Sequence, residues 1–308
     1  MTTLNISDTF KTAWHIYRAR FGEYYRIALA NSFWIFVPVY GWAKYAAMMG
    51  LLARLAYGDV TGNKETIAEA KRYIKPKTWF FFGAGLMGSL ILFLWVLLFS
   101  IPLLIVNSIV LSQSPSLIFS KPFLLLTSLI NLVFGYYFYK LMSRLFLYEL
   151  PLAIEQDTNA TESRDITWKL VTGSIFKLQI IICLFSIFFV FTYFIVQKIN
   201  GVISSGINFE SILNLLDFST LNFFNVFSET ISFFGVVFVP ALSSAIGMLL
   251  AAINPFVNSF FSSEVNVILF LLDTIRMELV YIAYGALFIP FWQSLKAVVY
   301  YRLNRTSS

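Results

Sequence analysis

Polar, charged stretches alternate with long apolar runs along most of this chain. Several of the apolar runs reach the roughly 20 residues that a helix needs to cross the hydrocarbon core of a bilayer. The pattern predicts an all-α, polytopic membrane protein: about six to eight membrane helices, with amphipathic interfacial helices between them, in one integral membrane domain over residues 1–308. The predicted apolar segments are Ile27–Ala56, Trp79–Val106, Phe123–Tyr148, Leu178–Val196, Ile231–Ile253, Val265–Leu279 and Val280–Tyr301.

The stretch Asp8–Tyr24 predicts a helix that lies on the membrane surface. Its rings recur at the spacing of one helical face, and its basic residues fall on another face. The rings are Phe10, Trp14, Tyr17 and Phe21, and the basic face holds Lys11, His15 and Arg18. Such a helix lies in the headgroup plane with its rings toward the acyl chains. Packing of the same helix on a partner protein is the alternative.

Two further polar stretches follow the same plan. Thr61–Lys77 predicts a second surface helix that Pro76 stops, and Gln156–Lys169 predicts a third. Basic residues of the first two surface helices are candidates for contacts with lipid headgroups, because anionic headgroups attract basic side chains at the membrane surface. These candidates are Lys11, Arg18, Lys71, Arg72, Lys75 and Lys77.

Proline breaks the apolar runs at both ends of the chain. Ile27–Ala56 is marginal for two full spans, so either the first helix begins before Ile27 or the two parts around Pro38 form a re-entrant or tilted hairpin. Near the C-terminus, an even number of crossings after Val265 is needed to keep both ends on one side, which predicts a second hairpin that turns near Pro290. The sequence therefore predicts Pro-broken hairpins at both ends.

The two proline segments also resemble each other. Ile35–Tyr40 reads IFVPVY and Leu287–Trp292 reads LFIPFW. Duplication of a membrane unit, with halves 1–155 and 156–308, would produce this similarity. Chance similarity between Phe-rich helices is an equally good explanation.

The composition confirms the class of protein and indicates how it is oriented. Hydrophobic residues make up 58%, charged residues 12%, and the mean hydropathy is +0.76, whereas soluble domains carry about 25% charged residues. Most Lys and Arg residues lie in the first 30 residues, in 54–77, in 140–177 and after Lys296. The positive-inside rule then predicts that both termini are cytoplasmic and that the net charge of +6 reflects membrane orientation rather than nucleic-acid binding.

The sequence offers little catalytic chemistry. It holds one cysteine, Cys183, and one histidine, His15, which excludes cysteine metal sites and multi-histidine centres. It has no phosphate loop, no GxSxG and no HExxH. We therefore predict no catalytic, cofactor-binding or metal-binding residues, no cofactor, and a protein that is not an enzyme.

Charged residues within apolar runs are the main functional candidates, because ionisable groups at membrane depth mark pathways or buried pairs. The candidate intramembrane charges are Lys44, Asp273, Arg276 and Glu278. Asp273 and Arg276 are spaced i, i+3 and could pair on one face. Lys140, Arg144 and Glu149 are instead expected to lie within reach of a membrane surface.

Three segments resemble the glycerophosphoryl diester phosphodiesterase membrane-domain family: DTFKTAWHIYRARFGEYY, VPVYGWAKYAA and the final AVVYYRLNR. The resemblance implies a multi-helix membrane module that either precedes a catalytic barrel or stands alone, and the stand-alone form is similar to uncharacterised proteins of cyanobacteria. The family's last helix often ends in Tyr-x-Asp-Leu-Arg, whereas Tyr301–Arg305 has no acidic residue.

The resemblance does not imply phosphodiesterase activity. That activity belongs to a barrel of roughly 250 residues with paired catalytic histidines and a metal held by carboxylates. This sequence has a single histidine and no polar stretch of that length.

These observations predict a membrane scaffold or accessory subunit that binds lipid headgroups or partner proteins. It would lie in the plasma (inner) membrane, or in the thylakoid membrane of a cyanobacterium. Membrane lipids, and a protein partner or a second copy, are the expected partners, and nucleic acid is not. The alternatives are a transporter or lipid-handling permease with a site near Asp273 and Arg276, and an intramembrane enzyme.

Overall fold

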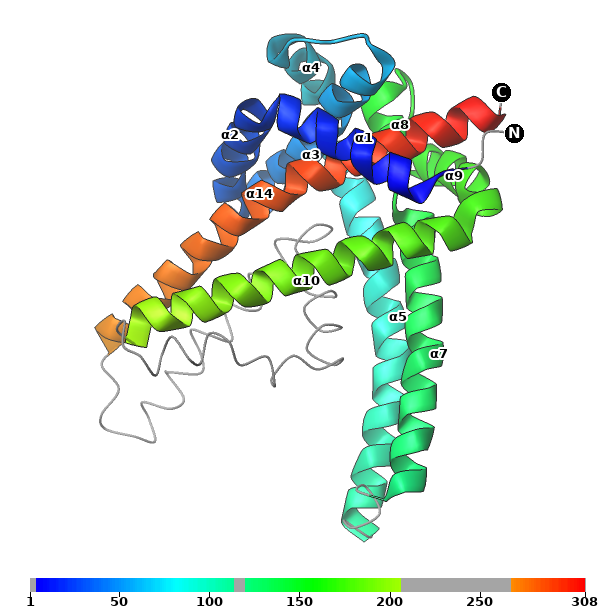
Figure 1. The fold of residues 1–308 in the computed structure, drawn as a ribbon, viewed down its shortest axis with the longest axis vertical. Coiled ribbons are helices and arrows are strands. Elements are labelled where there is room, and N and C mark those ends of the chain that lie inside the picture. Colours follow the sequence, from blue (N-terminus) through cyan, green and yellow to red (C-terminus); the bar gives the residue numbers. More distant parts are fainter. Residues whose placement is uncertain (1–3, 114–119, 206–266, 308) are drawn as a thin grey trace.

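The computed structural model describes residues 4–113, 120–205 and 267–307, and within these ranges the regular structure is helical. Long helices project from a cluster of shorter ones (Figure 1). The α-helices are α1 (Ile6–Ala19), α2 (Phe21–Ser32), α3 (Tyr40–Thr61), α4 (Ile67–Ile74), α5 (Thr78–Gln113), α7 (Lys121–Leu145), α8 (Glu149–Ile154), α9 (Ala160–Val171), α10 (Ile175–Ser205) and α14 (Val267–Ser307). Short 3₁₀ turns are η1 (Phe33–Phe36), η2 (Lys75–Lys77) and η3 (Thr172–Ser174).

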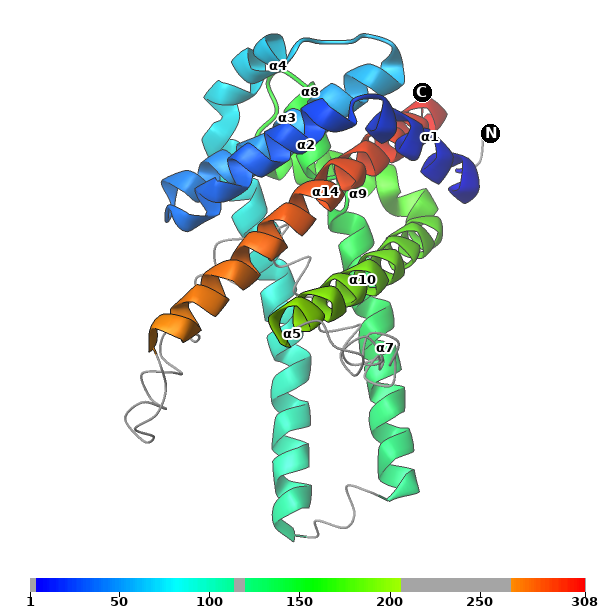
Figure 2. The same cartoon turned by 60° about the vertical axis from the view of Figure 1, so that its left-hand side comes forward.

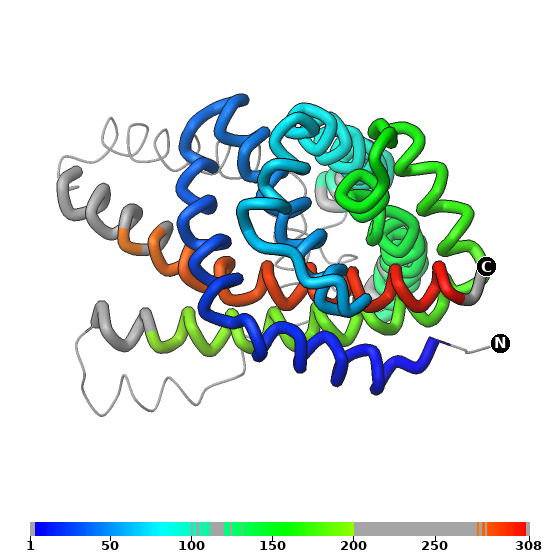
Figure 3. Tube along the Cα trace, turned by 90° about the horizontal axis from the view of Figure 1, so that it is seen from above, coloured from blue at the N-terminus to red at the C-terminus, as the bar shows by residue number. Residues whose placement is uncertain are grey.

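The first predicted surface helix is two helices rather than one. The chain leaves helical geometry at Arg20, with φ −122° and ψ 27°, between α1 and α2. Arg20 is held there by ion pairs with Glu23 and Asp59. The break lets α2 leave the direction of α1 and pack against both α3 and α14, while α1 packs along the C-terminal part of α14 (Figure 3).

The aromatic face of α1 packs partly against α14 and is partly exposed. Phe10, Trp14 and Tyr17 all contact the ring of Phe291 on α14, and Tyr17 Oη donates to the Leu287 carbonyl at 2.9 Å. Burial raises the pKa of Tyr17 to about 12. Trp14 nevertheless stays half exposed. The expectation that the whole ring face points into lipid is therefore wrong for Tyr17, which is buried.

The break predicted at Pro38 is confirmed. Helix α2 continues as η1, the chain turns at 37–39, and α3 returns. Gly41 is required at this turn, because a Cβ there would lie 2.1 Å from the Trp34 carbonyl oxygen. The two arms thus form a tight helical hairpin, which we call the α2–α3 hairpin.

The hairpin predicted at Pro290 is wrong, because α14 runs through this residue without interruption. A proline inside a helix removes one backbone hydrogen bond and disfavours the helix. Here every residue from 289 to 300 is buried, and that packing outweighs the local cost. The two similar hexapeptides therefore differ in structure, a turn around Pro38 and a helix around Pro290. Duplication at residue 155 stays a prediction.

The other two predicted surface helices lead directly into membrane helices. Helix α4 passes through η2 into α5, and α9 passes through η3 into α10. Pro76 therefore does not stop the helical path, since it occupies an early position of η2, where its missing N–H is tolerated. Capping boxes begin both α4, at Thr66, and α9, at Asn159.

Four helical segments of the described residues are long and apolar enough to cross a membrane: Ile67–Phe99, Lys121–Ile154, Ala160–Ile199 and Ile282–Arg305. The predicted span Ile231–Ile253 lies outside the described residues. Helix α10 continues to Ser205, beyond the end of the predicted apolar segment at Val196.

The outward faces of the long helices are apolar. Leu98 on α5 is 64% exposed, Leu125 on α7 is 71% exposed and Phe176 at the start of α10 is 70% exposed. Helices α5 and α7 project together away from the cluster (Figures 1 and 2). Exposed apolar surface of this extent marks contact with lipid, which agrees with integration in a membrane.

Candidate functional site

Two buried charges of opposite sign meet between α8 and α14. Lys296 Nζ lies 2.8 Å from Glu149 Oε1, and the side chains are 0% and 9% exposed. The Lys296 ammonium also lies 5.4 Å from the centre of the Trp292 ring and 5.8 Å from that of Phe146. A buried charge is tolerated only with a partner, so this ion pair connects two helices that are far apart in sequence.

The C-terminal end of α8 is capped by side chains from α4 and η2. Lys77 Nζ donates to the Leu152 carbonyl at 3.2 Å and to the Glu155 carbonyl. Tyr73 Oη donates to the Ile154 carbonyl at 3.1 Å. The last carbonyls of a helix lack intrahelical partners and carry its negative dipole end, so a cation is favourable here.

Arg54 on α3 completes this cap. Its Nη1 donates to the Ala153 carbonyl at 2.8 Å, and its other guanidinium nitrogens bind both oxygens of Glu65 at 2.7 and 2.6 Å. Its guanidinium carbon lies 3.6 Å from the centre of the Tyr73 ring. A planar guanidinium makes all of these contacts at once, which an ammonium could not do.

Helix α14 reaches the same place through Tyr300, whose Oη donates to Glu155 Oε1 at 3.1 Å. Side chains of α3, α4, η2 and α14 thus converge on α8, and we call this set the α8 junction. It consists of Arg54, Glu65, Tyr73, Lys77, Glu149, Glu155, Lys296 and Tyr300. The charges bind one another and backbone carbonyls, an arrangement suited to holding helices together rather than to catalysis.

The expectation that Glu149 lies within reach of the surface is wrong, because Glu149 is buried against Lys296. The two are 147 residues apart. The signal available in the sequence was a lone lysine inside the apolar run 280–301, a position that requires a partner. Nothing in the sequence identified that partner.

The four candidate intramembrane charges are not brought together. Lys44 is half-buried on α3, where its ammonium lies 3.7 Å from the centre of the Trp34 ring and 4.8 Å from that of Tyr40. Arg276 is half-buried on α14. The side chains of Asp273 and Glu278 lie outside the described residues, so the Asp273–Arg276 pair stays a prediction.

The headgroup candidates separate into two groups. Lys11 and Arg18 on α1 and Lys71, Arg72 and Lys75 around α4 are exposed. Lys77 is buried in the α8 junction and cannot contact headgroups. The reason is its place directly before α5, where the C-terminal end of α8 offers carbonyl acceptors.

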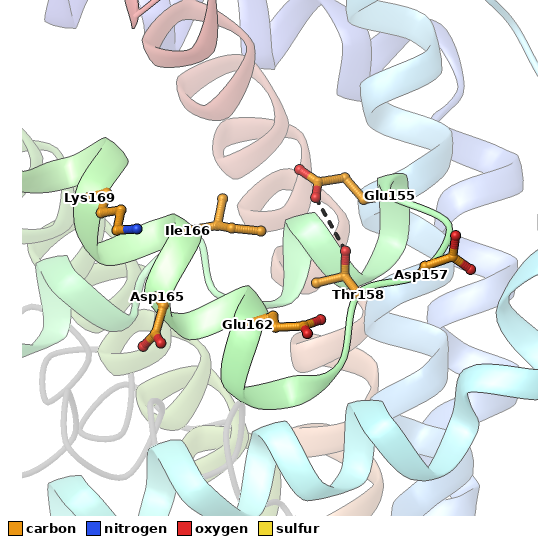
Figure 4. A pocket seen from close by; sticks show the side chains of 7 residues that line it. All are labelled: Glu155, Asp157, Thr158, Glu162, Asp165, Ile166 and Lys169. Carbon is orange, nitrogen blue, oxygen red and sulfur yellow. Dashed lines mark hydrogen bonds between the residues drawn. The ribbon is translucent and has the colours of Figure 1, made fainter.

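An open hollow of about 500 Å³ lies beside α9 (Figure 4). It is lined by Glu155, Asp157, Thr158, Glu162, Asp165, Ile166 and Lys169. Thr158 faces Glu155 and hydrogen-bonds to it at 3.2 Å, whereas the Asp157 and Asp165 side chains point in different directions (Figure 4). Among the described residues, no three His, Cys, Asp or Glu side chains are placed to hold a metal ion.

The chain matches no protein-family model, no curated protein sequence and no solved structure. The resemblance to the glycerophosphoryl diester phosphodiesterase membrane-domain family therefore stays a prediction.

Proposed function

We propose that this protein is a non-enzymatic membrane scaffold or accessory subunit that binds anionic lipid headgroups through α1 and α4 and presents this surface to partner proteins. The observation that carries the proposal is the exposed basic face of α4. Lys71, Arg72 and Lys75 are exposed, whereas Ala70 and Ile74 on the opposite side are buried. The helix is thus fixed on the protein with its cations turned outward.

The position of α4 favours contact with a bilayer. Through η2 it leads directly into α5, which has lipid-facing apolar side chains. A basic helix joined to a membrane helix lies at headgroup level, where each Lys or Arg contributes about 1 kcal/mol of attraction to an anionic surface. On α1, Lys11 and Arg18 share an exposed face with Trp14, a residue typical of the interface.

The proposed location is the plasma (inner) membrane, or a thylakoid membrane, with both termini cytoplasmic. Contacts between the two ends of the chain support a common side. Arg302 on α14 forms an ion pair with Asp8 and donates to Thr9 Oγ1 at 3.0 Å. The described ends lie close together (Figure 3), and the basic residues near them favour the cytoplasmic side.

Lipid-dependent stability tests the headgroup part of the proposal. The detergent-solubilised protein is unfolded thermally with added phosphatidylglycerol or phosphatidylcholine. We expect phosphatidylglycerol to stabilise the wild type, because a ligand of the native state raises its stability. Arg72→Gln should lose about 1 kcal/mol of that gain. Lys121 is an exposed cation at the N-terminal end of α7, so Lys121→Gln is the charge-matched control, and it should keep the full stabilisation by phosphatidylglycerol.

Equal stabilisation of wild type and Arg72→Gln, or an equal loss in Lys121→Gln, would refute headgroup binding by α4. Purification from native membranes in nanodiscs, followed by mass spectrometry, tests the partner part. A protein recovered in stoichiometric amount supports an accessory subunit. A lone chain enriched in one small molecule would instead favour a permease.

A further inference from the structure

The tip of the α2–α3 hairpin is apolar and exposed. Phe33, Phe36, Val37, Val39 and Tyr40 each expose between 41% and 53% of their surface. All five lie within residues 33–40, on both sides of the turn, and we call them the hairpin tip. Large aromatic and branched side chains gathered at one exposed end indicate a contact with something apolar.

The charges of the hairpin lie at its other end. Arg20 pairs with Asp59 at 3.3 Å, and Tyr24 Oη donates to Asp59 Oδ2 at 2.6 Å. Between Arg26 and Lys44 the sequence has no charged residue. The hairpin is therefore polarised along its length, with a charged base and an apolar tip. A protein-binding helix would more often be polarised across its width.

Two backbone amides at the tip are bonded within the hairpin, even though the tip is irregular. The Tyr40 amide donates to the Pro38 carbonyl at 2.7 Å, which closes a γ-turn with Val39 at φ 61° and ψ −68°. A β-branched residue at positive φ is strained. The Val37 amide donates to the Trp34 carbonyl at 3.1 Å. In a medium without water an unpaired amide is costly, so a strained residue that allows these two hydrogen bonds to form is favourable there.

Polar side chains near the tip are also turned inward. Trp42 Nε1 donates to the Ile35 carbonyl at 3.0 Å, across the two arms. Asn31 and Ser32 donate to carbonyls of their own helix at 2.7 and 2.8 Å. Side chains in water have no need of such partners, whereas in hydrocarbon an unmet donor is costly.

The length of the hairpin sets how far it could enter a bilayer. From Arg26 to Val37 the chain rises about 17 Å, and from Arg54 back to Tyr40 about 21 Å. These lengths exceed one leaflet of the hydrocarbon core, about 15 Å, and fall short of its full thickness of about 30 Å. The α2–α3 hairpin is accordingly absent from the four described segments with the length and composition of a span.

Lys44 is the one cation in the outer part of the hairpin. Its ammonium lies over the rings of Trp34 and Tyr40. Cation–π contact strengthens as water is removed, so the rings shield the charge from an apolar medium. The flexible stem also allows the ammonium to extend toward lipid phosphates.

We propose that the hairpin tip is a re-entrant membrane-binding surface. It enters the bilayer from the side on which Arg20 and Asp59 lie, contacts lipid acyl chains, and does not emerge on the other side. Helix α14 lies against both arms and continues past the tip (Figures 1 and 2). The α2–α3 hairpin is therefore supported by a helix that extends beyond it.

Spin-label accessibility in liposomes tests this proposal. Cys183, the one cysteine of the sequence, is replaced by Ala, and a nitroxide is attached at V37C. Glu23→Cys at the exposed base is the polar control, and Leu98→Cys on α5 is the lipid-facing control. The ratio of oxygen to nickel-chelate collision rates should be several-fold higher at V37C than at E23C, and close to that at L98C.

F36C, at a second exposed tip residue, repeats the measurement if V37C folds poorly. A nickel-accessible tip would mean that it lies in water, and a label reached by neither reagent would mean that protein covers it. Labelling of V37C by an impermeant maleimide from the side opposite to E23C would mean that the hairpin crosses. Each of these outcomes overturns the proposal. None of these measurements depends on phosphatidylglycerol. The hairpin can therefore prove re-entrant even if α4 does not bind headgroups, and α4 can bind headgroups even if the hairpin is not re-entrant.

Discussion

Removing one partner of the Lys296–Glu149 pair should destabilise the protein far more than removing both. The variants are Lys296→Met, which keeps the length of the side chain, Glu149→Gln, which keeps its shape, and the double variant. Each single change leaves the other group without its ionic partner in the interior, since Lys296 is 0% exposed and Glu149 is 7% exposed.

The magnitude follows from the geometry. At 2.8 Å and an effective dielectric constant near 20, the attraction between the charges is about 6 kcal/mol, and desolvation of the two ions offsets much of it. Breaking one side of a buried pair typically costs 3–5 kcal/mol, whereas replacing both sides is often nearly neutral. We therefore expect about 3–5 kcal/mol for each single variant and a double variant within about 2 kcal/mol of wild type.

Unfolding in mixed detergent and dodecyl sulfate, followed by far-ultraviolet circular dichroism, measures these differences. Fluorescence is a poorer probe, because Trp292 lies 5.4 Å from the Lys296 ammonium. The matched control is the exposed pair of Arg164 and Asp165, joined at 2.9 Å with side chains 32% and 58% exposed. Arg164→Gln should cost less than about 1 kcal/mol, as exposed pairs do.

Additivity would refute the reasoning. If the double variant loses the sum of the two single losses, Lys296 and Glu149 do not stabilise each other and the pair is not the reason for their burial. Single losses as small as that of Arg164→Gln would show that water reaches both groups. Either result would show that the Lys296–Glu149 pair is not what connects α8 to α14.

Two further predictions concern the α2–α3 hairpin, and both are measured by the same unfolding experiment. Gly41→Ala should cost about 1–3 kcal/mol, because its Cβ would lie 2.1 Å from the Trp34 carbonyl oxygen; Gly83→Ala, with nothing within 4 Å, should be neutral or slightly stabilising. Tyr24→Phe should cost about 1.5–3 kcal/mol, since it removes a hydrogen bond to the Asp59 carboxylate. Burial and the hydrogen bond to Asp59 raise the pKa of Tyr24 above its ordinary value of 10.0. Above that pH the unfolded chain loses the phenol proton while the folded protein keeps it, so the free energy of unfolding of the wild type falls as the pH rises. Tyr24→Phe has no phenol and should lack this fall in stability. An unchanged alkaline slope in Tyr24→Phe, or equal effects of the two glycine changes, would contradict these expectations.

Local patterns predicted most of the helices. The apolar runs became α5, α7 and α10, and the polar stretches around 61–77 and 156–169 became short amphipathic helices that precede membrane helices. These features depend on residues a few positions apart, since period and capping act within one or two turns. The turn at Pro38 was equally local, because the Trp34–Gly41 contact closes within eight residues.

Pro290 was misjudged because its effect depends on distant residues. A proline is a local breaker, yet α14 around it is buried against α1, α2 and α3. This helix buries many apolar side chains, and each large one contributes about 1.5–3 kcal/mol. One lost hydrogen bond cannot offset that gain. The sequences around Pro38 and Pro290 are similar, but the turn also requires Gly41 three residues after Pro38, whereas Gln293, three residues after Pro290, is buried in α14.

The cations show the same limit more clearly. An ionisable group inside an apolar run needs a partner, so the sequence could indicate this need for Lys44 and Lys296, whereas Lys77 lies in a polar stretch and was expected at lipid headgroups. It could not say what kind. Lys44 lies over aromatic rings, Lys77 binds the carbonyls at a helix end, and Lys296 binds a carboxylate. These three arrangements differ in what they leave free. Lys296 is bound to Glu149 Oε1 and Lys77 to carbonyls at the end of α8, whereas the Lys44 ammonium over its rings keeps N–H groups that can donate to a lipid phosphate. Lys44 is therefore the one of the three whose partner could change with its surroundings, and its ammonium lies over Tyr40 of the hairpin tip, which is proposed to enter the bilayer.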